Sequence, residues 1–394
     1  MDTIDFIFLK KYYISINPKA LMRKIVIIVS LFLCVSVAYS QTLDEYYNKG
    51  YDYGEAGKYE EAIIYYTKAL ELNNEYVDAY INRGAAYHKL RNYLNAIADF
   101  NKAIELNPKD ARAFTNRANA FSRLGDTKKA IADHDKAIEL DPKFIWAYYN
   151  RGHAYDKLGS YQQAISDYSK VIELNPTYGG AYNNRGRAYH KLRHYLNAIA
   201  DYTKAIELDP KLAAMGYYNL GISYEALENY QQAIAYYSKA IEFDPKNANA
   251  YNNRGYCNHL LGDNEQAIAD FSKAIELDLK DILAYNNRGN VYQILGEYQR
   301  AIEDFSKTIE LEPNNDFAIY NRGKAYQILG ELLNAIADYT KAIELNPQYA
   351  EAYYHRATLY REQRNILLAC ADLQKATELG YIEAAAMIEE FCKK

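Results

Sequence analysis

Apolar and polar residues follow a pattern along this chain that returns at almost constant spacing. The pattern is clearest in residues 79–84 (AYINRG). The last slot of this stretch holds glycine, or alanine twice, at Gly50, Gly84, Ala118, Gly152, Gly186, Gly221, Gly255, Gly289, Gly323 and Ala357. Every step is 34 residues except that from Gly186 to Gly221, which is 35. A fixed period of this length is typical of stacked structural repeats that share one elongated hydrophobic core.

Each repeat contains two segments with the apolar spacing of an amphipathic helix. With Val77 as position 1, apolar or small residues recur at positions 4, 8 and 11, and again at positions 20, 24 and 27. Proline closes several repeats, as at Pro108. The turn between the two segments is marked by Gly125, Gly159, Gly262, Gly296 and Gly330, because a helix end accepts a left-handed glycine. The pattern therefore predicts a helix, a turn and a second helix in each repeat.

This pattern of aromatic, glycine, alanine and proline positions resembles the tetratricopeptide repeat. Ten such repeats span residues 43–381. The resemblance implies an all-α fold, a right-handed superhelical solenoid whose first helices line a concave, peptide-binding groove. Residues 382–394 are predicted to form a C-terminal capping helix, since Ala384, Ile388 and Phe391 would cover the core of the last repeat.

Eight repeats depart from the family pattern in the same way, with arginine at position 7 and aspartate at position 23. The pairs are Arg83 with Asp99, Arg117 with Asp133, Arg151 with Asp167, Arg185 with Asp201, Arg254 with Asp270, Arg288 with Asp304, Arg322 with Asp338, and Arg356 with Asp372. Repeats 1 and 6 lack both partners and carry Lys49 with Tyr65 and Leu220 with Tyr236. Because the partners are lost together, we predict a structural, bidentate ion pair between the two helices of one repeat.

Residues 1–40 lie outside the repeats. Residues 22–40 resemble a secretory signal peptide, with Arg23 and Lys24 before the apolar run 25–37 and small residues before Gln41. The apolar run is shorter than the roughly 20 residues of a membrane-spanning helix, so we expect removal rather than anchoring. Residues 1–21 are interpreted as an upstream extension or a misplaced start, with Met22 as the better initiator. The expected location is periplasmic or secreted.

Export would change the net charge of the mature chain, and it bears on the state of the cysteines. The whole chain has a formal charge of −5, and residues 1–40 hold five basic and two acidic residues, so the mature chain would carry −8. An acidic chain is a poor candidate for nucleic-acid binding. Cys370 and Cys392 lie on either side of the turn near Gly380, where an antiparallel helix pair would bring them level. In an exported protein they form either a disulfide or two buried thiols.

One linker is longer than the others. Residues 211–216 contain the single extra residue of the array, and the repeat that follows lacks the Arg–Asp pair. Two interpretations remain open: a tolerated insertion, or a change of superhelical pitch between repeats 1–5 and 6–10.

Positions 2, 5, 6, 9, 12 and 13 of the first helix are predicted to form its open face. Position 6 is asparagine in nine repeats, among them Asn184, Asn253 and Asn287, and position 5 adds Asn183, Asn252 and Asn286. These amides would hold a peptide backbone or would bond neighbouring repeats.

The character of position 13 changes along the array. It is basic at Lys89, Arg123, Lys157 and Lys191, with Arg187 nearby, and apolar from Ala226 to Ile328. This suggests a cationic stretch for an acidic partner segment, or a solvated edge. At position 2, Trp146 and Phe317 are apolar where the groove should be open, which favours either a partner contact or packing against an adjacent loop.

No catalytic, cofactor or metal motif is present in the sequence: it has no phosphate-binding glycine loop, no H-E-x-x-H and no C-x-x-C. We therefore expect no catalytic activity, and the resemblance to the tetratricopeptide repeat implies a scaffold that binds protein or peptide. The alternative is recognition of envelope carbohydrate through the aromatic and asparagine-rich face. Most of the 43 tyrosines occupy recurring packing slots, which favours an aromatic core over a binding ladder.

Overall fold

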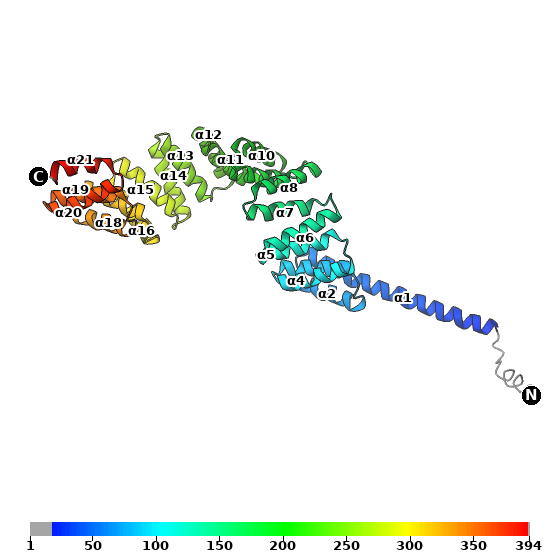
Figure 1. Cartoon of the computed structure of the whole chain (residues 1–394). Coiled ribbons are helices and arrows are strands. Elements are labelled where there is room, and N and C mark those ends of the chain that lie inside the picture. Colours follow the sequence, from blue (N-terminus) through cyan, green and yellow to red (C-terminus); the bar gives the residue numbers. More distant parts are fainter. Residues whose placement is uncertain (1–17, 393–394) are drawn as a thin grey trace, which may run out of the picture. The chain divides into compact units, whose positions relative to one another are not determined.

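The computed structural model describes residues 18–392, which form 21 α-helices and one 3-10 turn, and no strand is found in this range (Figure 1). It divides into an N-terminal unit, up to Pro176, and a C-terminal unit, from Thr177. The N-terminal unit contains α1 (Pro18–Glu55), α2 (Tyr59–Leu72), α3 (Val77–Lys89), α4 (Tyr93–Leu106), α5 (Ala111–Arg123), α6 (Thr127–Leu140), α7 (Ile145–Lys157) and α8 (Tyr161–Leu174).

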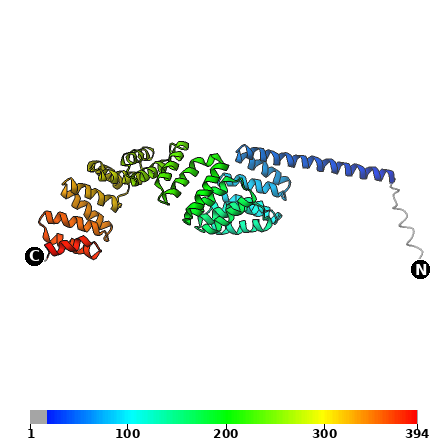
Figure 2. The same cartoon turned by 90° about the horizontal axis from the view of Figure 1, so that it is seen from above.

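The C-terminal unit contains the remaining helices. They are α9 (Gly179–Lys191), α10 (Tyr195–Leu208), η1 (Pro210–Leu212), α11 (Ala213–Glu225), α12 (Tyr230–Phe243), α13 (Ala248–Leu260), α14 (Asn264–Leu277), α15 (Ile282–Ile294), α16 (Tyr298–Leu311), α17 (Asp316–Ile328), α18 (Leu332–Leu345), α19 (Ala350–Glu362), α20 (Ile366–Glu378) and α21 (Ile382–Phe391). In both units the helices pack in consecutive pairs, one pair per predicted repeat (Figures 1 and 2). The expected all-α fold of stacked helix pairs is confirmed.

A residue with left-handed backbone conformation follows the first helix of every repeat, at position 15. Glycine occupies it at the five predicted turns and at Gly57. The other four repeats place Arg91, Arg193, Glu228 and Arg364 there, with φ between 58° and 61°. An aspartate or asparagine often follows and caps the second helix, as Asp126 does by accepting from the backbone N–H of Lys129. The turn geometry is therefore constant although the residue type is not.

Close approach of the paired helices explains why position 8 is glycine. A Cβ at Gly84 would lie 2.7 Å from Phe100, and one at Gly221 would lie 2.5 Å from Tyr237. The two repeats with alanine at position 8, Ala118 and Ala357, do not carry Phe or Tyr at position 24; they carry His134 and Leu373. Positions 8 and 24 thus vary together within this chain, as close packing of two helices requires.

All eight Arg–Asp pairs are present in the structure, each joining the two helices of one repeat. In every pair the arginine Nε donates to Oδ2 of the aspartate at 2.8–2.9 Å, and Nη2 donates to Oδ1 at 2.6–2.8 Å. The aspartates are buried. The hydrogen bonds that Arg322 donates to Asp338 raise the pKa of Arg322 above its usual range.

The third arginine nitrogen makes a contact that the sequence did not predict. In seven repeats Nη1 donates to position 25 of the preceding repeat, at Thr67, Asn101, Asp135, Ser238, Ser272, Ser306 and Thr340. Each guanidinium also lies 5.5–6.0 Å from one or two aromatic rings at positions 4 and 11 of its own helix. We call this guanidinium with its contacts the arginine staple.

A tyrosine ring takes the place of the arginine staple in repeats 1 and 6. Tyr236 stacks on Tyr224 at 5.2 Å and on Tyr217 at 6.2 Å. In repeat 1, Tyr65 stacks on Tyr53 at 5.3 Å. The flat space that holds a guanidinium elsewhere is filled by a third ring in these two repeats.

The extra residue of linker 211–216 is absorbed inside the C-terminal unit. Residues Pro210–Leu212 form the 3-10 turn η1, and α11 begins at Ala213. Gly216 occupies position 3, where eight repeats have alanine, and a Cβ there would lie 2.5 Å from Ile206. Helices α10 and α11 remain packed through a cluster that includes Ala198, Tyr202 and Leu220. The insertion is accommodated locally, by a tight turn and a close helix contact.

At the N-terminus, α1 continues without a break from Pro18 into the first helix of repeat 1 (Figure 2). The predicted signal segment 22–40 lies within this helix, and Met22 and residues 25–29 are exposed. Of the predicted extension 1–21, residues 1–17 lie outside the described part of the chain. Among the helices that are described, none combines the length and apolar character needed to cross a membrane.

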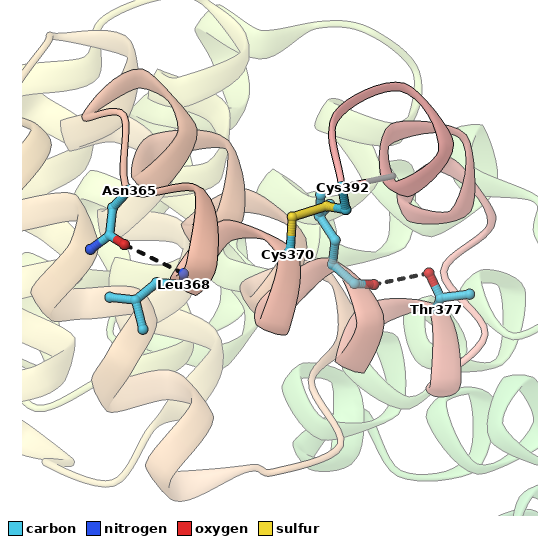
Figure 3. Close-up of a disulfide and its surroundings, with 6 residues drawn as sticks. Asn365, Leu368, Cys370, Thr377 and Cys392 are labelled. Carbon is cyan, nitrogen blue, oxygen red and sulfur yellow. Dashed lines mark hydrogen bonds between the residues drawn. A yellow bond between two sulfur atoms is a disulfide. The ribbon is translucent and has the colours of Figure 1, made fainter. Parts of the chain in front are cut away.

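At the C-terminus, α21 covers the last repeat. Ala384 is buried against Ala357, Leu373 and Ala376, and Ile388 packs against the same cluster. A disulfide joins Cys370 of α20 to Cys392, directly after α21, with a Cα–Cα distance of 5.8 Å (Figure 3). Of the two states that the sequence left open for these cysteines, the structure has the disulfide.

Candidate functional site

The first helices of neighbouring repeats contact one another in the N-terminal unit, through α1, α3, α5 and α7. Their common face is hollowed at three places that share lining residues. The first hollow (≈ 310 Å³) and the second (≈ 500 Å³) both contact Asn82. The second and the third (≈ 320 Å³) both contact Asn119 and Asn150. We call the three together the inner groove.

The second hollow carries the aromatic part of the inner groove. Its lining includes Phe144, Trp146 and Asn116. Trp146 is 49% exposed, and its ring meets that of Tyr149 edge-on at 6.2 Å. A half-exposed tryptophan held by a neighbouring ring is a suitable anchor for an apolar side chain of a partner.

Arg112 also lines the second hollow, but its charge is neutralised. Its Nη2 lies 2.7 Å from Oδ1 of Asp78 and 2.6 Å from Oδ2 of Asp110. The hydrogen bonds to Asp110 hold the pKa of Arg112 above its usual range. This guanidinium therefore has a structural role, because both of its ion-pair partners belong to the fold.

The third hollow is basic. It is lined by His88, Asn119, Ser122, Arg123, Tyr149, Asn150, His153, Ala154 and Lys157, and none of these residues is acidic. Arg123 and Lys157 are exposed at the ends of α5 and α7. The sequence predicted both residues for the groove, and the structure brings them to one hollow.

His88 joins the third hollow from α3. Burial, and then the nearby charges of Arg123 and Lys89, lower the pKa of His88 below its ordinary value. Its ring lies 5.2 Å from that of Tyr93, and its Nε2 atom is buried without a hydrogen-bond partner. The imidazole is therefore uncharged at neutral pH.

The first hollow is of mixed charge. Lys89, the predicted start of the basic row, lines it beside Glu55, Tyr51, Tyr59 and Tyr66. Lys89 and Arg123 therefore line different hollows of the inner groove. Asn119, Ser122 and Glu55 were not singled out from the sequence, although they occupy positions 9, 12 and 13 of the predicted open face.

Three asparagines of the C-terminal unit that were predicted for the open face, Asn183, Asn252 and Asn286, are buried. Position 5 lies against the neighbouring first helix: the amide of Asn287 donates to Oδ1 of Asn252 at 3.1 Å. Asn253 donates in the same way to the Tyr218 hydroxyl at 3.5 Å.

These contacts answer part of the question that the sequence left open for the amides. In the N-terminal unit, Asn82 likewise donates to the Tyr47 hydroxyl at 2.9 Å. Asn82, Asn253 and Asn287 therefore bond neighbouring repeats, while Asn82 also lines the inner groove. Asn184 is buried beside Asn183.

The remaining predicted groove residues of the C-terminal unit are spread along it. Lys191 is exposed, Arg187 is half-buried, and Phe317 is 46% exposed at position 2 of repeat 9.

Comparisons with known proteins agree with this architecture. A tetratricopeptide repeat model matches residues 77–110, 145–178, 180–212, 214–247, 248–281, 282–315 and 317–349, which is more than half of the chain. A TPR repeat model matches 50–90 and 118–159, and a further tetratricopeptide repeat model matches 100–132 and 338–371. No curated protein sequence matches the chain.

Several solved structures are similar. YrrB, described as a TPR protein with an unusual peptide-binding site, is 28% identical over 47% of this chain and 95% of its own, with a TM-score of 0.42. A tetratricopeptide repeat protein from Parabacteroides merdae is 22% identical over 72% and 99%, with a TM-score of 0.43. The pilF protein of Pseudomonas aeruginosa is 20% identical over 54% and 96%, with a TM-score of 0.47.

Proposed function

Because the chain belongs to the tetratricopeptide repeat family, we propose that it is a non-catalytic scaffold that binds a protein or peptide segment in the inner groove. The observation that carries this proposal is the continuity of the three hollows along α1, α3, α5 and α7. Such a groove matches an extended chain better than a compact small molecule.

The chemistry of the inner groove supports a peptide as the occupant. Amides at Asn116, Asn119 and Asn150 offer both donors and acceptors, as a peptide backbone requires. Trp146 offers an apolar anchor, and the cations of the third hollow favour an acidic segment of the partner. Since the paired helices are held by arginine staples, little ordering cost falls on the scaffold when the partner binds.

We further propose that the scaffold works outside the cytoplasm, in the periplasm or beyond the cell. The proposed signal segment 22–40 and the disulfide between Cys370 and Cys392 both support export, because disulfides persist mainly in oxidising compartments. In this proposal the signal segment is removed and no membrane anchor remains.

Photo-crosslinking from the inner groove tests the proposed function. A photo-reactive residue replaces Trp146 in the full-length chain, which is then exposed to cell-envelope extract. The same residue is placed in a groove variant, Lys89→Glu, Arg123→Glu and Lys157→Glu. A matched control carries Lys109→Glu, Lys128→Glu and Lys143→Glu, three exposed lysines of the same unit that do not line the inner groove.

We expect a defined protein to be captured by the native groove and by the matched control, and to be lost from the groove variant, with all three folded by circular dichroism. Equal capture by all three would remove the inner groove as the binding site. Capture of polysaccharide in place of protein would favour the carbohydrate alternative.

A further inference from the structure

The two cations of the third hollow differ from the other groove arginine of the N-terminal unit. Arg112 is held by two carboxylates, and the arginines at position 7 are all paired with aspartate. Within residues 18–392, neither Arg123 nor Lys157 has an ion-pair or hydrogen-bond partner, yet both line the same hollow. Two positive charges therefore line one hollow whose other lining residues include no carboxylate.

The rest of the lining adds hydrogen-bond donors around these charges. Ser122 contributes a hydroxyl, Asn119 and Asn150 contribute amides, and His88 and His153 contribute imidazoles. A hollow rich in donors, with two unpaired cations and no acidic group, is complementary to an anion with several oxygen acceptors.

We propose that the third hollow is a binding subsite for a tetrahedral dianion, a phosphate monoester. One carboxylate would neutralise only one of the two cations, whereas a phosphate monoester carries a charge of about −1.5 to −2 and three acceptor oxygens. Arg123 offers its planar fork to two oxygens and Lys157 a point charge to the third. Delivery of this group on a phosphorylated peptide rests on the proposed function; binding of the free monoester does not.

His88 makes the proposed subsite sensitive to pH. The groups that face it are Lys89 on its own helix, Tyr93 of α4, Arg123 and the backbone of Asn119 on α5, and the other basic lining residues on α7. In the free chain, burial and the charges of Arg123 and Lys89 keep the imidazole neutral. A bound dianion favours the charged imidazolium, so the pKa of His88 rises on binding and a proton is taken up.

Calorimetric titration of the full-length chain with small anions tests the subsite. The probes are phenyl phosphate, inorganic phosphate and sulfate as tetrahedral anions, acetate as a monocarboxylate and succinate as a dicarboxylate. We expect saturable binding of the tetrahedral anions at one site, with acetate and succinate at least about tenfold weaker. Succinate binding as tightly as phenyl phosphate would overturn the tetrahedral assignment.

Paired variants separate a built subsite from general electrostatic attraction. Arg123→Gln with Lys157→Gln is expected to weaken phenyl phosphate binding by at least about tenfold, since each removes a charge-assisted hydrogen bond. Lys128→Gln with Lys143→Gln changes the net charge equally but lies outside the hollow, and should leave the affinity unchanged. Equal loss in both variants, or no saturable binding to the native chain, would overturn the proposal.

Sulfate isolates the proton uptake, because it does not titrate near neutral pH. Titrations with sulfate in buffers of different ionisation enthalpy should show proton uptake by the native chain and none by His88→Gln. Affinity should fall as pH rises through the pKa of His88 in the complex. Sulfate binding without proton uptake would remove His88 from the subsite. These measurements involve no peptide, so their failure and that of the crosslinking test are distinguishable.

Discussion

Repeats 8 and 6 of the C-terminal unit place different groups between the same pair of tyrosine rings. In repeat 8 the guanidinium of Arg288 lies 6.0 Å from Tyr285 and 5.8 Å from Tyr292, and Asp304 neutralises it. In repeat 6 the ring of Tyr236 lies between Tyr217 and Tyr224. The comparison shows that the slot requires a flat group, and that charge is only one way to fill it.

The two solutions differ in how they connect to the preceding repeat. In repeat 8, Nη1 of Arg288 donates to the Ser272 hydroxyl at 2.9 Å, so the arginine staple joins two repeats by a directed bond. In repeat 6, Leu220 makes the connection by packing against Tyr202 and Ala198. Each repeat is thus held in register, by polar contacts in one and by apolar contacts in the other.

Removing one half of the arginine staple should have the largest effect. Asp304→Leu leaves the guanidinium of Arg288 half-buried without its carboxylate, which costs about 3–5 kcal/mol. The double change Arg288→Leu with Asp304→Tyr copies repeat 6 and should cost about 1 kcal/mol or less. Urea unfolding gives the overall loss, and hydrogen exchange in α15 and α16 localises it, because repeat arrays can unfold in parts. An equal cost for the single and double changes would contradict this account.

Replacing the glycine at position 8 by alanine should cause the next largest loss of stability. The loss should be greater in repeat 6 than in repeat 8. A Cβ at position 221 would lie 2.5 Å from two atoms of Tyr237, whereas one at position 289 would lie 3.0 Å from Phe305. Gly221→Ala should cost about 2–3 kcal/mol and Gly289→Ala about 1 kcal/mol, since overpacked cores typically lose about 1–3 kcal/mol.

A compensating variant provides the control for this prediction. Repeat 10 already combines alanine at position 8 with Leu373 at position 24. Adding Phe305→Leu to Gly289→Ala copies that combination and should relieve the overlap that Gly289→Ala creates. An equal loss of stability on Gly289→Ala, whether position 305 is phenylalanine or leucine, would contradict this account. In that case close packing is not the reason for glycine at position 289. The measurement is the denaturant midpoint of the native chain, of Gly289→Ala, of Phe305→Leu and of the double variant.

The sequence was informative where one residue type recurs at one position. The joint absence of arginine and aspartate from repeats 1 and 6 was enough to predict which residues pair. It could not predict the contact of Nη1, because position 25 varies among threonine, asparagine, aspartate and serine. Several unlike side chains satisfy the same donor, so the sequence shows no pattern there.

The candidate site was less predictable for a geometric reason. Helical periodicity placed position 5 on the open face, but it cannot show how closely neighbouring first helices approach. In the structure that approach buries Asn252 and Asn286. The meeting of Arg123, Lys157 and His88 at one hollow also depends on this approach, because the three come from different repeats.

Repeat 6 has a pH-dependent weakness that repeat 8 does not share. Its position-12 residue, Glu225, accepts a hydrogen bond from the Tyr237 hydroxyl at 2.5 Å, whereas repeat 8 has Gln293. Burial raises the pKa of Glu225 above 4.5, its ordinary value. The protonated form therefore favours the fold, and this stabilisation is lost as pH rises through the folded-state pKa.

The change Glu225→Gln should therefore raise the urea midpoint at pH 7 and make little difference well below pH 4.5, where the carboxyl is protonated in both states. Urea titrations of both proteins across this range provide the measurement. Glu242→Gln, an exposed carboxylate on the neighbouring helix α12, serves as the control and should leave the pH dependence unchanged. A midpoint difference that is the same at every pH would show that the pKa of Glu225 is not raised in the fold.

The smallest difference between the two repeats lies in their turns. Repeat 6 places Glu228 at φ 58°, where repeat 8 has Gly296 at φ 77°. A side chain costs about 1 kcal/mol in this region, while glycine costs chain entropy on folding. Glu228→Gly should therefore stabilise by about 0.5 kcal/mol and Gly296→Ala destabilise by a similar amount. Because a Cβ at position 296 meets nothing closer than 4.0 Å, the second change tests backbone strain alone. Opposite shifts of the urea midpoint would confirm that both repeats share one turn geometry; shifts of the same sign would contradict it.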